Sequence, residues 1–305
     1  MTAFNSEEAA ACRRLVEMAL AEDLAVAGDR TSRALIPAEQ LGQAAFVARS
    51  AGVVAGLPAA AMVCEMLPGA SLTFTARLAD GASVQPGTVV ATVSGPLRGI
   101  LAAERTVLNF LQRLSGIATL TQHYVAAAAG FPAQILDTRK TTPGWRLLEK
   151  YAVRQGGGHN HRIGLFDGIL IKDNHLAGLR GDVQLTIETA RSARGNDWLP
   201  VEVEVDTLEQ FDEALAAKAD IVLLDNMNPE TMRTAVARRN AVSPDTKLEA
   251  SGGVNLATVA AIAATGVDRI SVGAITHSAP ALDIALDYQS RDRLGSGGLG
   301  ETVAR

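Results

Sequence analysis

The sequence predicts an α/β protein in which a small N-terminal α+β domain precedes an α/β barrel. In the first 116 residues, short alternating apolar runs are separated by turn signals, which is typical of an antiparallel sheet. Beyond them, six short apolar runs alternate with helical patterns, and this alternation implies a parallel sheet. The repeats carry no dinucleotide-binding glycine fingerprint, which favours a barrel over a doubly wound sheet.

The N-terminal region begins with helical periodicity over residues 7–20. Three runs then alternate as strands do: GQAAFVARS at 42–50, SLTFTARL at 71–78 and TVVATVSG at 88–95. A long helical stretch follows over residues 101–129, with a predicted weak point at Ser115 and Gly116. Residues 291–305 are Gly-rich and polar, and we expect them to be mobile.

The second region repeats a strand followed by a helix. Thr207 is a predicted N-cap for one intervening helix, and Pro229 lies in the first turn of another. In barrels of this type the chemistry gathers at the C-terminal ends of the strands, where this sequence places Lys, Asp, His and Glu. The six predicted strands are ILDTRK from Ile135, GILIKDNH from Gly168, VEVEVD from Val201, IVLLDN from Ile221, KLEASGG from Lys247 and RISVGAI from Arg269.

The composition is that of an ordinary globular protein, with 305 residues, 48% of them apolar, and a net charge of −5. An acidic chain argues against a general nucleic-acid or membrane-surface binder, and 4% aromatic residues leave little material for base stacking. Cys12 and Cys64 form no pattern, which suggests thiols in a reducing compartment. Residues 51–67 are too short and too interrupted to span a bilayer, so we expect a cytoplasmic protein.

A basic cluster stands out in this acidic chain. Arg139 and Lys140 end one predicted strand, His161 and Arg162 follow three consecutive glycines, and Lys172 ends the next strand. Bringing like charges together costs free energy unless an anion with several charges is bound. The planar guanidinium group of arginine can donate two parallel hydrogen bonds to a carboxylate or a phosphate. The cluster therefore predicts an anion site, although separate surface ion pairs with nearby carboxylates stay open as an alternative.

Two other uses of these residues remain open at this point. His159 and His161 share one face of an extended chain and could bind zinc together with His175, but neither cysteine is close in sequence. Lys140 or Lys172 could instead serve a Schiff-base aldolase, in which the amine must be desolvated or crowded to become nucleophilic.

An acidic group lies on the following strands. Glu202 and Glu204 are two residues apart and point to one side, and Asp225 ends the next strand. Buried carboxylates need partners, and hard oxygen ligands suit Mg²⁺, which often bridges to substrate phosphates. The sequence thus predicts contacts with Mg²⁺ or sugar hydroxyls, with a structural salt bridge to inward lysines as the equal alternative.

Two Gly-rich turns complete the set: SGGV at 251–254 and SVGAITHS at 271–278. Small residues expose backbone N–H groups there, and barrels often bind phosphate at their last two strands. His277 could add a donor, although simple tight turns are the alternative. Cations, carboxylates and amide donors together predict a pair of substrates rather than one ligand.

Six motifs taken together resemble the quinolinate phosphoribosyltransferase family. The resemblance extends from Glu7 to Tyr288, and its long central motif is highly specific. It implies an N-terminal α/β sandwich domain of residues 1–116, completed by 281–305, and an incomplete (open) α/β barrel of residues 117–280. The motifs are ERTVLNFLQRLSGIAT, DTRKTTPGWRLLEKYAVRQGGGHNHRIGLFDGILIKDNH, VEVEVD, LLDNM, EASGGV and ISVGAITHS.

The resemblance also implies an activity. The family transfers phosphoribosyl from phosphoribosyl pyrophosphate (PRPP) to quinolinate in the presence of Mg²⁺. It releases pyrophosphate and CO₂ and makes nicotinate mononucleotide for NAD synthesis. It acts as a homodimer whose active site takes residues from the partner's N-terminal domain.

Site residues follow from matching the motifs. Lys140 corresponds to a lysine that contacts both substrates in the family. Glu204 and Asp225 correspond to an acidic pair near the ribose and Mg²⁺. The resemblance implies that these three residues are catalytic. The quinolinate pocket corresponds to Arg139, His161, Arg162 and Lys172, with Arg105 as the arginine donated by the partner. The phosphate-binding turns correspond to Ser251, Gly252, Gly273 and His277.

The nearest rival is a related phosphoribosyltransferase for another pyridine acid such as nicotinate. Nicotinate has one carboxylate and needs fewer cations, so the crowded basic cluster favours a dicarboxylate. The aldolase that would use Lys140 or Lys172 remains the rival from another class.

Overall fold

The computed structural model describes residues 4–194 and 199–289, and the predicted mobile tail at 291–305 lies outside them. The chain divides into two compact units. One unit contains residues 4–116 and 280–289, and the other contains residues 117–279 apart from the four undescribed positions. No helix in the described ranges is long and apolar enough to cross a membrane.

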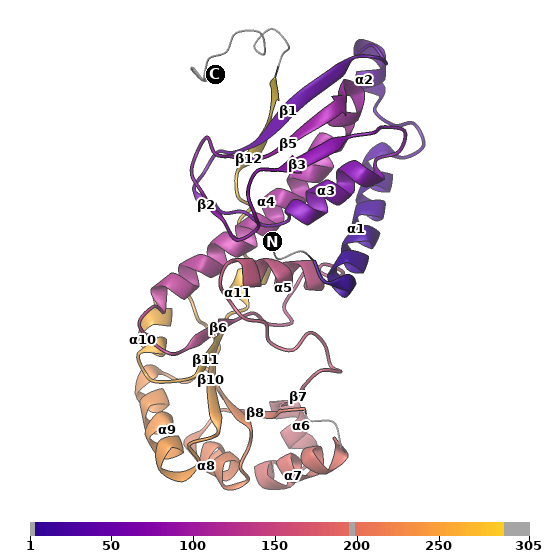
Figure 1. The fold of residues 1–305 in the computed structure, drawn as a ribbon. Helices are drawn as coiled ribbons and strands as arrows, with labels where there is room; N and C mark the ends of the chain where they lie inside the picture. The colour runs from indigo at the N-terminus through magenta and orange to yellow at the C-terminus, as the bar shows by residue number, and fades with distance from the viewer. Residues whose placement is uncertain (1–3, 195–198, 290–305) are drawn as a thin grey trace. The chain divides into compact units, whose positions relative to one another are not determined.

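The first unit is built on a four-stranded antiparallel sheet in the order β12-β1-β5-β3. Figure 1 shows helices α1, α3 and α4 gathered along this sheet. All three predicted strands are present, and each of their ends is shifted by one or two residues from the predicted position. The elements are α1 (Ser6–Leu24), α2 (Arg30–Leu35), β1 (Leu41–Ala48), β2 (Gly52–Val53), α3 (Leu57–Met66), β3 (Thr73–Ala76), β4 (Ser83–Val84), β5 (Val89–Pro96), the first part of α4 (Leu97–Ala127) and β12 (Ile284–Gln289).

Helix α1 begins where the sequence supplies a capping box. The Asn5 side chain accepts a hydrogen bond from the Glu8 amide at 2.9 Å, and the Glu8 carboxylate accepts one from the Asn5 amide at 2.9 Å. These two bonds satisfy amide groups that would otherwise have no partner in the first turn.

The predicted weak point in the long helix is wrong, because α4 runs unbroken through Ser115 and Gly116. The Ser115 hydroxyl accepts a hydrogen bond from the Ala55 amide at 2.9 Å and donates to the Ala55 carbonyl at 3.1 Å. A Cβ at Gly116 would overlap the Pro280 carbonyl. The small residue therefore allows the returning chain to pass close to the helix, and the chain then pairs β12 with β1.

The second unit is an open barrel. Its six parallel strands have the order β6-β11-β10-β9-β8-β7, and the described strands β6 and β7 do not pair to close it. The elements are the end of α4, β6 (Gln134–Leu136), α5 (Arg146–Gln155), β7 (Ile169–Ile171), α6 (Asp173–Gly178), α7 (Val183–Ala193), β8 (Val201–Val205), α8 (Leu208–Ala216), β9 (Ile221–Asp225), α9 (Pro229–Val242), β10 (Lys247–Ser251), α10 (Val259–Ala263), β11 (Arg269–Ser271) and α11 (Ala274–His277).

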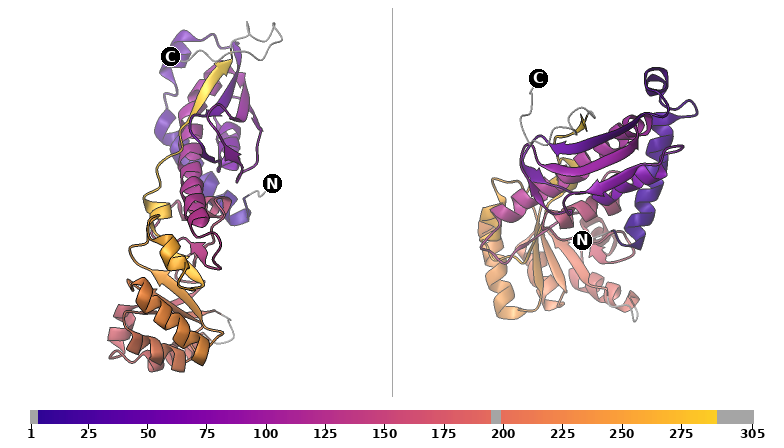
Figure 2. Two further views of the ribbon diagram at one scale, coloured as in Figure 1. Left: turned by 90° about the vertical axis from the view of Figure 1, so that its left-hand side faces the viewer. Right: turned by 45° about the horizontal axis from the view of Figure 1, so that its top comes forward.

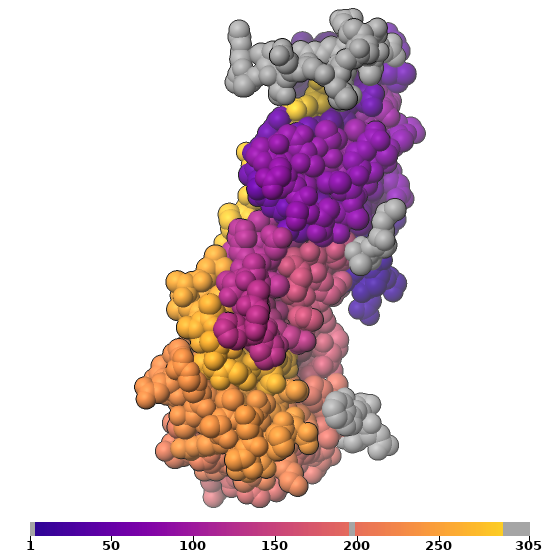
Figure 3. All heavy atoms as spheres, turned by 60° about the vertical axis from the view of Figure 1, so that its left-hand side comes forward, coloured from indigo at the N-terminus to yellow at the C-terminus, as the bar shows by residue number. Residues whose placement is uncertain are grey.

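Helices cover the outside of this barrel. Figure 1 labels α8, α9 and α10 beside the strands, and Figures 2 and 3 show the same orange part of the chain as a ribbon and as atoms. Thr207 caps α8 by accepting from the Gln210 amide at 3.3 Å, and Pro229 begins α9, as the sequence predicted. The strands bury apolar side chains such as those of Val203, Leu224 and Ala250. Polar side chains of the strands lie at the strand ends and inside the barrel.

Candidate active site

A cavity of about 590 Å³ lies at the C-terminal ends of the barrel strands. It brings together most of the residues that the sequence singled out, because parallel strands end at one edge of a sheet. Its lining consists of Thr138, Arg139, Lys140, His161, Arg162, Leu170, Lys172, Glu204, Leu223, Asp225, Asn226, Glu249, Ser251, Gly252, Gly253 and Ser271.

The segment that carries His161 is fixed by a buried ion pair. The Lys150 ammonium donates to Asp137, and both side chains are fully buried. Asp137 also accepts from the His161 amide at 2.9 Å, and Lys150 donates to the His161 carbonyl at 2.9 Å. Burial raises the pKa of Asp137 and lowers that of Lys150, and their mutual attraction opposes both shifts. The pair therefore holds the backbone of His161 from both sides.

The glycines before this segment permit a close approach. A Cβ at Gly156 would overlap the Ala118 carbonyl, and one at Gly158 would lie 2.7 Å from the Thr121 side chain. Gly157 has a φ of +84°, which side chains rarely adopt. His159 then forms a parallel bridge with Leu136 at the open edge of β6. The glycines thus let the loop lie against α4 and extend the sheet.

The guanidinium groups of Arg139 and Arg162 both line this cavity. The Arg162 Nη1 donates to the Gly168 carbonyl at 3.1 Å. Burial and the charge of Arg139 lower the pKa of Arg162. The Nε of Arg139 is buried and has no hydrogen-bond partner. A bound anion would satisfy this donor and relieve the repulsion between the two cations.

The acidic side of the cavity is formed by strand ends. Glu204 accepts from the Lys172 ammonium at 2.7 Å, and Asp225 accepts from the side-chain Nδ2 of Asn226 at 2.7 Å. Burial and the negative charges of Glu204 and Asp206 raise the pKa of Asp225. Adjacent carboxylates of this kind are a suitable donor set for a hard cation.

The Gly-rich turns lie beside these carboxylates. Gly252 has a φ of +92°, and a Cβ there would overlap the Asn226 side-chain amide. Gly273 is close to Lys140, since a Cβ would lie 3.0 Å from the Lys140 Cδ and 3.2 Å from the His277 Nε2. Gly273 and His277 are therefore next to a cavity residue, although neither lines the cavity itself.

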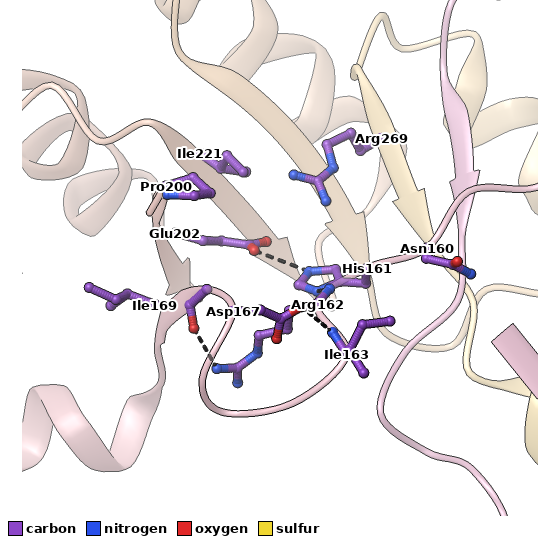
Figure 4. A pocket seen from close by; sticks show the side chains of 11 residues that line it. Asn160, His161, Arg162, Ile163, Asp167, Ile169, Pro200, Glu202, Ile221 and Arg269 are labelled. Carbon is purple, nitrogen blue, oxygen red and sulfur yellow. Dashed lines mark hydrogen bonds and ion pairs between the residues drawn. The ribbon is translucent and has the colours of Figure 1, made fainter. Parts of the chain in front are cut away.

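A second cavity of about 310 Å³ lies near the N-terminal ends of β7, β8, β9 and β11. His161 and Arg162 line both cavities. Figure 4 shows Glu202 of β8 directed toward His161. Arg269 lies on β11, which β10 and β9 separate from β8 in the sheet. The sequence did not single out Arg269 or Glu249. Glu249 could have been found from its spacing, because it is two residues before Ser251 and points to the same side of β10.

Some predicted residues are not brought together. His159 is exposed, and the His175 Nδ1 accepts from the Lys172 amide at 2.9 Å. The described residues form a potential metal-ligand group at His161, Glu202 and Glu249, but not at the predicted zinc set of three histidines. Arg105 is exposed on α4 in the first unit, and its assignment stays a prediction.

The fold and the cavity define a class of open α/β-barrel protein with a pocket lined by arginine and lysine side chains at the C-terminal ends of its strands. The profile of the quinolinate phosphoribosyl transferase C-terminal domain matches residues 117–287, and that of the N-terminal domain matches residues 29–115. This chain therefore belongs to the quinolinate phosphoribosyltransferase family, as the motifs indicated.

Individual relatives agree with this assignment. The nicotinate-nucleotide pyrophosphorylase [carboxylating] of Mycobacterium leprae is 46% identical over 278 residues, which are 91% of this chain and 97% of the relative. A probable enzyme of the same name from Bacillus subtilis is 44% identical, covering 90% of this chain and 92% of its own. The solved nicotinate-nucleotide pyrophosphorylase of Francisella tularensis has a TM-score of 0.86 at 41% identity, over 92% of this chain and 97% of that one.

Proposed function

We propose that this chain transfers phosphoribosyl from PRPP to quinolinate with loss of CO₂, giving nicotinate mononucleotide and pyrophosphate in NAD biosynthesis. The supporting observation is one cavity lined by the guanidinium groups of Arg139 and Arg162, called the basic side, and by the carboxylates of Glu204 and Asp225, called the acidic side, together with Glu249. Similar proteins are named for the same activity. In this reading the pyridine dicarboxylate binds on the basic side, and the phosphoribosyl group binds on the acidic side.

On the basic side, Arg139, His161, Arg162 and Lys172 bind quinolinate. The unpartnered Nε of Arg139 supports this role, because a buried donor without a partner is costly in the absence of an acceptor. A monocarboxylate would leave part of this positive charge uncompensated, so a dicarboxylate fits better than nicotinate.

On the acidic side, Glu204 and Asp225 would hold Mg²⁺ directly or through water. The raised pKa of Asp225 supports this assignment, since a cation would relieve the repulsion between the two carboxylates. When bound, Mg²⁺ would stabilise negative charge on the departing pyrophosphate. Ser251, Gly252, Gly273 and His277 would bind phosphate through amide and side-chain donors.

The chemistry assigned to the chain is mainly electrostatic. As the bond from ribose C1 to pyrophosphate breaks, positive charge develops on C1, and Glu204 and Asp225 stabilise it. Lys140 lies in the same cavity and contacts both substrates as a cation. The ring nitrogen then attacks C1, and the alkylated ring accepts the electrons left by CO₂. The basic side orients both carboxylates throughout.

The rival Schiff-base chemistry is less well supported. The Lys172 Nζ lies 2.7 Å from a Glu204 oxygen, and this contact occupies the amine that would have to attack a carbonyl. Borohydride trapping in the presence of a carbonyl substrate would distinguish the two chemistries.

The direct test is to incubate the protein with quinolinate, PRPP and Mg²⁺ and to measure nicotinate mononucleotide and CO₂. We expect both products in equal amounts, and neither product when EDTA replaces Mg²⁺. Replacing quinolinate with nicotinate tests the related phosphoribosyltransferase: turnover of nicotinate alone would contradict the proposal.

We also propose a homodimer whose partner supplies Arg105 to the quinolinate pocket. Arg105→Ala and Arg139→Ala chains should each be inactive, whereas a mixture of them should regain activity because hybrid dimers contain one intact site. Confirmed subunit exchange without regained activity would refute the shared site. A cytoplasmic location is a further proposal, supported by the buried free cysteines Cys12 and Cys64.

A further inference from the structure

The basic side of the substrate cavity is built from two segments that helix α5 separates along the chain. One is the turn after β6, which carries Arg139 and Lys140, and the other is the loop that carries Arg162. Neither segment belongs to a helix or strand, so ladder hydrogen bonds do not fix the distance between them. Burial and the charge of Arg139 lower the pKa of Arg162, which shows that the two guanidinium groups repel each other. The two segments therefore need a connection that holds them together.

The turn after β6 is closed by its own hydrogen bonds. The Lys140 amide donates to the Thr138 hydroxyl at 3.1 Å, and the Thr141 amide donates to the Arg139 carbonyl at 3.0 Å. The Lys140 carbonyl accepts from the Thr276 hydroxyl at 2.7 Å, so Lys140 also has an anchor on α11. Because residues 138–141 form one unit, a contact that holds Thr141 also acts on Arg139.

The loop that carries Arg162 is closed in a similar way. The Asp167 carboxylate accepts from the Ile163 amide at 2.7 Å (Figure 4) and from the Gly164 amide at 2.8 Å. The Arg162 Nη1 donates to the Gly168 carbonyl at 3.1 Å, so this side chain lies back against its own loop. The position of Ile163 thus determines where the Arg162 guanidinium lies.

A third arginine, Arg146, joins these two units. It is the first residue of α5, it is half-buried, and it lines neither cavity of the described part of the chain. Its Nε donates to the Thr141 hydroxyl at 3.1 Å, and its Nη1 donates to the Ile163 carbonyl at 3.1 Å. Thr141 directly follows Lys140, and Ile163 directly follows Arg162. One planar guanidinium therefore connects the residues next to the cations of both segments.

We propose that Arg146 is a positioning residue that holds the guanidinium groups of Arg139 and Arg162 at the separation that the two carboxylates of quinolinate require. This inference rests on the proposed function. Quinolinate carries its carboxylates on neighbouring ring carbons, so both arginines can bind it at once only if the distance between them is fixed. The bridge through Arg146 supplies that distance before the ligand arrives.

The geometry of Arg146, rather than its charge, is what this bridge uses. A guanidinium presents five N–H donors in a fixed planar arrangement, so two of them can reach acceptors that lie in different directions. A lysine would keep the charge, but its donors share a single nitrogen on a flexible stem. Burial and the charge of Arg146 also lower the pKa of Lys150, so this charge acts against a neighbouring cation.

The test compares the two substrates in steady-state kinetics of the full chain. In Arg146→Met we expect the KM for quinolinate to rise about 10- to 100-fold, because a displacement of about 1 Å in a binding group can cost up to about two orders of magnitude. The KM for PRPP should stay unchanged, since Lys140 keeps its bond to Thr276. Arg146→Lys should also raise the KM for quinolinate, although it keeps the charge. Arg233→Lys, exposed on α9, should change neither KM.

A double-mutant cycle shows whether Arg146 acts through the bridge. Thr141→Val removes one acceptor of the bridge and keeps the branched shape of the side chain. Alone it should raise the KM for quinolinate by a smaller factor than Arg146→Met. Combined with Arg146→Met it should bring no further rise, because the bond to the hydroxyl is then already lost.

Several outcomes would overturn this inference. An unchanged KM for quinolinate in Arg146→Met would show that the bridge is not needed, and a wild-type KM in Arg146→Lys would assign the effect to charge alone. An equal rise of both KM values together with a lower Tm would make Arg146 merely structural. Additive losses in the double variant would place its action elsewhere. Absence of product with the wild-type chain would instead refute the proposed function.

If neither variant at Arg146 folds, Thr141→Val still decides. It removes a single hydroxyl at a half-buried position, so the fold should tolerate it. A rise in the KM for quinolinate without a rise in the KM for PRPP supports the inference. Unchanged KM values in the folded Thr141→Val chain overturn it.

Discussion

The two sides of the substrate cavity are held in place differently. On the basic side, His161 and Arg162 follow a loop whose backbone is tied to the buried pair of Asp137 and Lys150. On the acidic side, Glu204 and Asp225 belong to strands β8 and β9 themselves, so regular ladder hydrogen bonds position them.

This difference shows what each kind of support requires. A strand end needs no extra partner, because its neighbours fix the direction of each side chain. A loop that carries cations needs a separate internal anchor, and here that anchor is itself charged. The basic side should therefore be the more sensitive one to a change made far from the ligand.

The largest effect is expected from removing that anchor. Lys150→Met leaves the Asp137 carboxylate buried without its cation, and this should lower the free energy of unfolding by about 3–5 kcal/mol. Chemical denaturation would measure the loss. The double variant Asp137→Asn/Lys150→Met should recover part of it, since no buried charge then remains unpaired. A single variant as stable as the wild type would contradict the anchor.

A somewhat smaller effect is expected for the ligand contact on the same side. Arg162→Ala should weaken quinolinate binding by about 2–5 kcal/mol, because a bound carboxylate would lose its charged partner. Isothermal titration calorimetry measures this directly. Arg233→Ala, an exposed arginine on α9, should bind quinolinate as the wild type does. Equal quinolinate affinity of the two variants would show that quinolinate binds at another site.

On the acidic side, adding a single methyl group to the turn after β10 should lower the stability of the fold. Gly252→Ala combines a φ of +92° with an overlap against Asn226, and a cost of about 1–3 kcal/mol is expected from the strained conformation. Gly253→Ala is the matched control, since its φ is +63° but nothing lies within 4 Å. Thermal unfolding should show the larger loss for Gly252→Ala, and the reverse order would contradict the packing at this turn.

The smallest expected effect is a gain in the stability of the fold rather than a loss. The pKa of Asp225 is raised in the folded chain, so its ionisation destabilises the fold as pH rises through that pKa. Asp225→Asn should therefore raise Tm slightly at neutral pH, abolish phosphoribosyl transfer, and leave Tm unchanged well below the usual Asp pKa. Asp245→Asn, exposed before β10, should not show this pattern. A lower Tm for Asp225→Asn at neutral pH would show that its charge is structural.

The strand ends were predictable because alternation and order in the sequence already place them together. Glu204, Asp225 and Ser251 needed only the assumption of a parallel sheet to share one cavity. The family resemblance implied which parts of the substrates these residues contact, and it also implied the open form of the barrel.

The internal supports were not predictable in the same way. Lys150 lies on α5 and reads as an ordinary charged helix residue, yet it is fully buried against Asp137. The pairing of Glu249 with Arg269 depends on the register of β10 against β11, which no single strand specifies. The continuation of α4 through Gly116 was not predicted. In a sequence, a glycine that interrupts a helix looks the same as a glycine that makes room for a closely packed chain.

The return of the chain past Gly116 has a consequence for synthesis on the ribosome. Strand β1 pairs with β5 on one side and with β12 on the other, but β12 is translated only after the whole barrel. Until then one edge of β1 stays open to strands of other nascent chains. Slow translation through the barrel should therefore increase aggregation, and a supplied β12 peptide should suppress it.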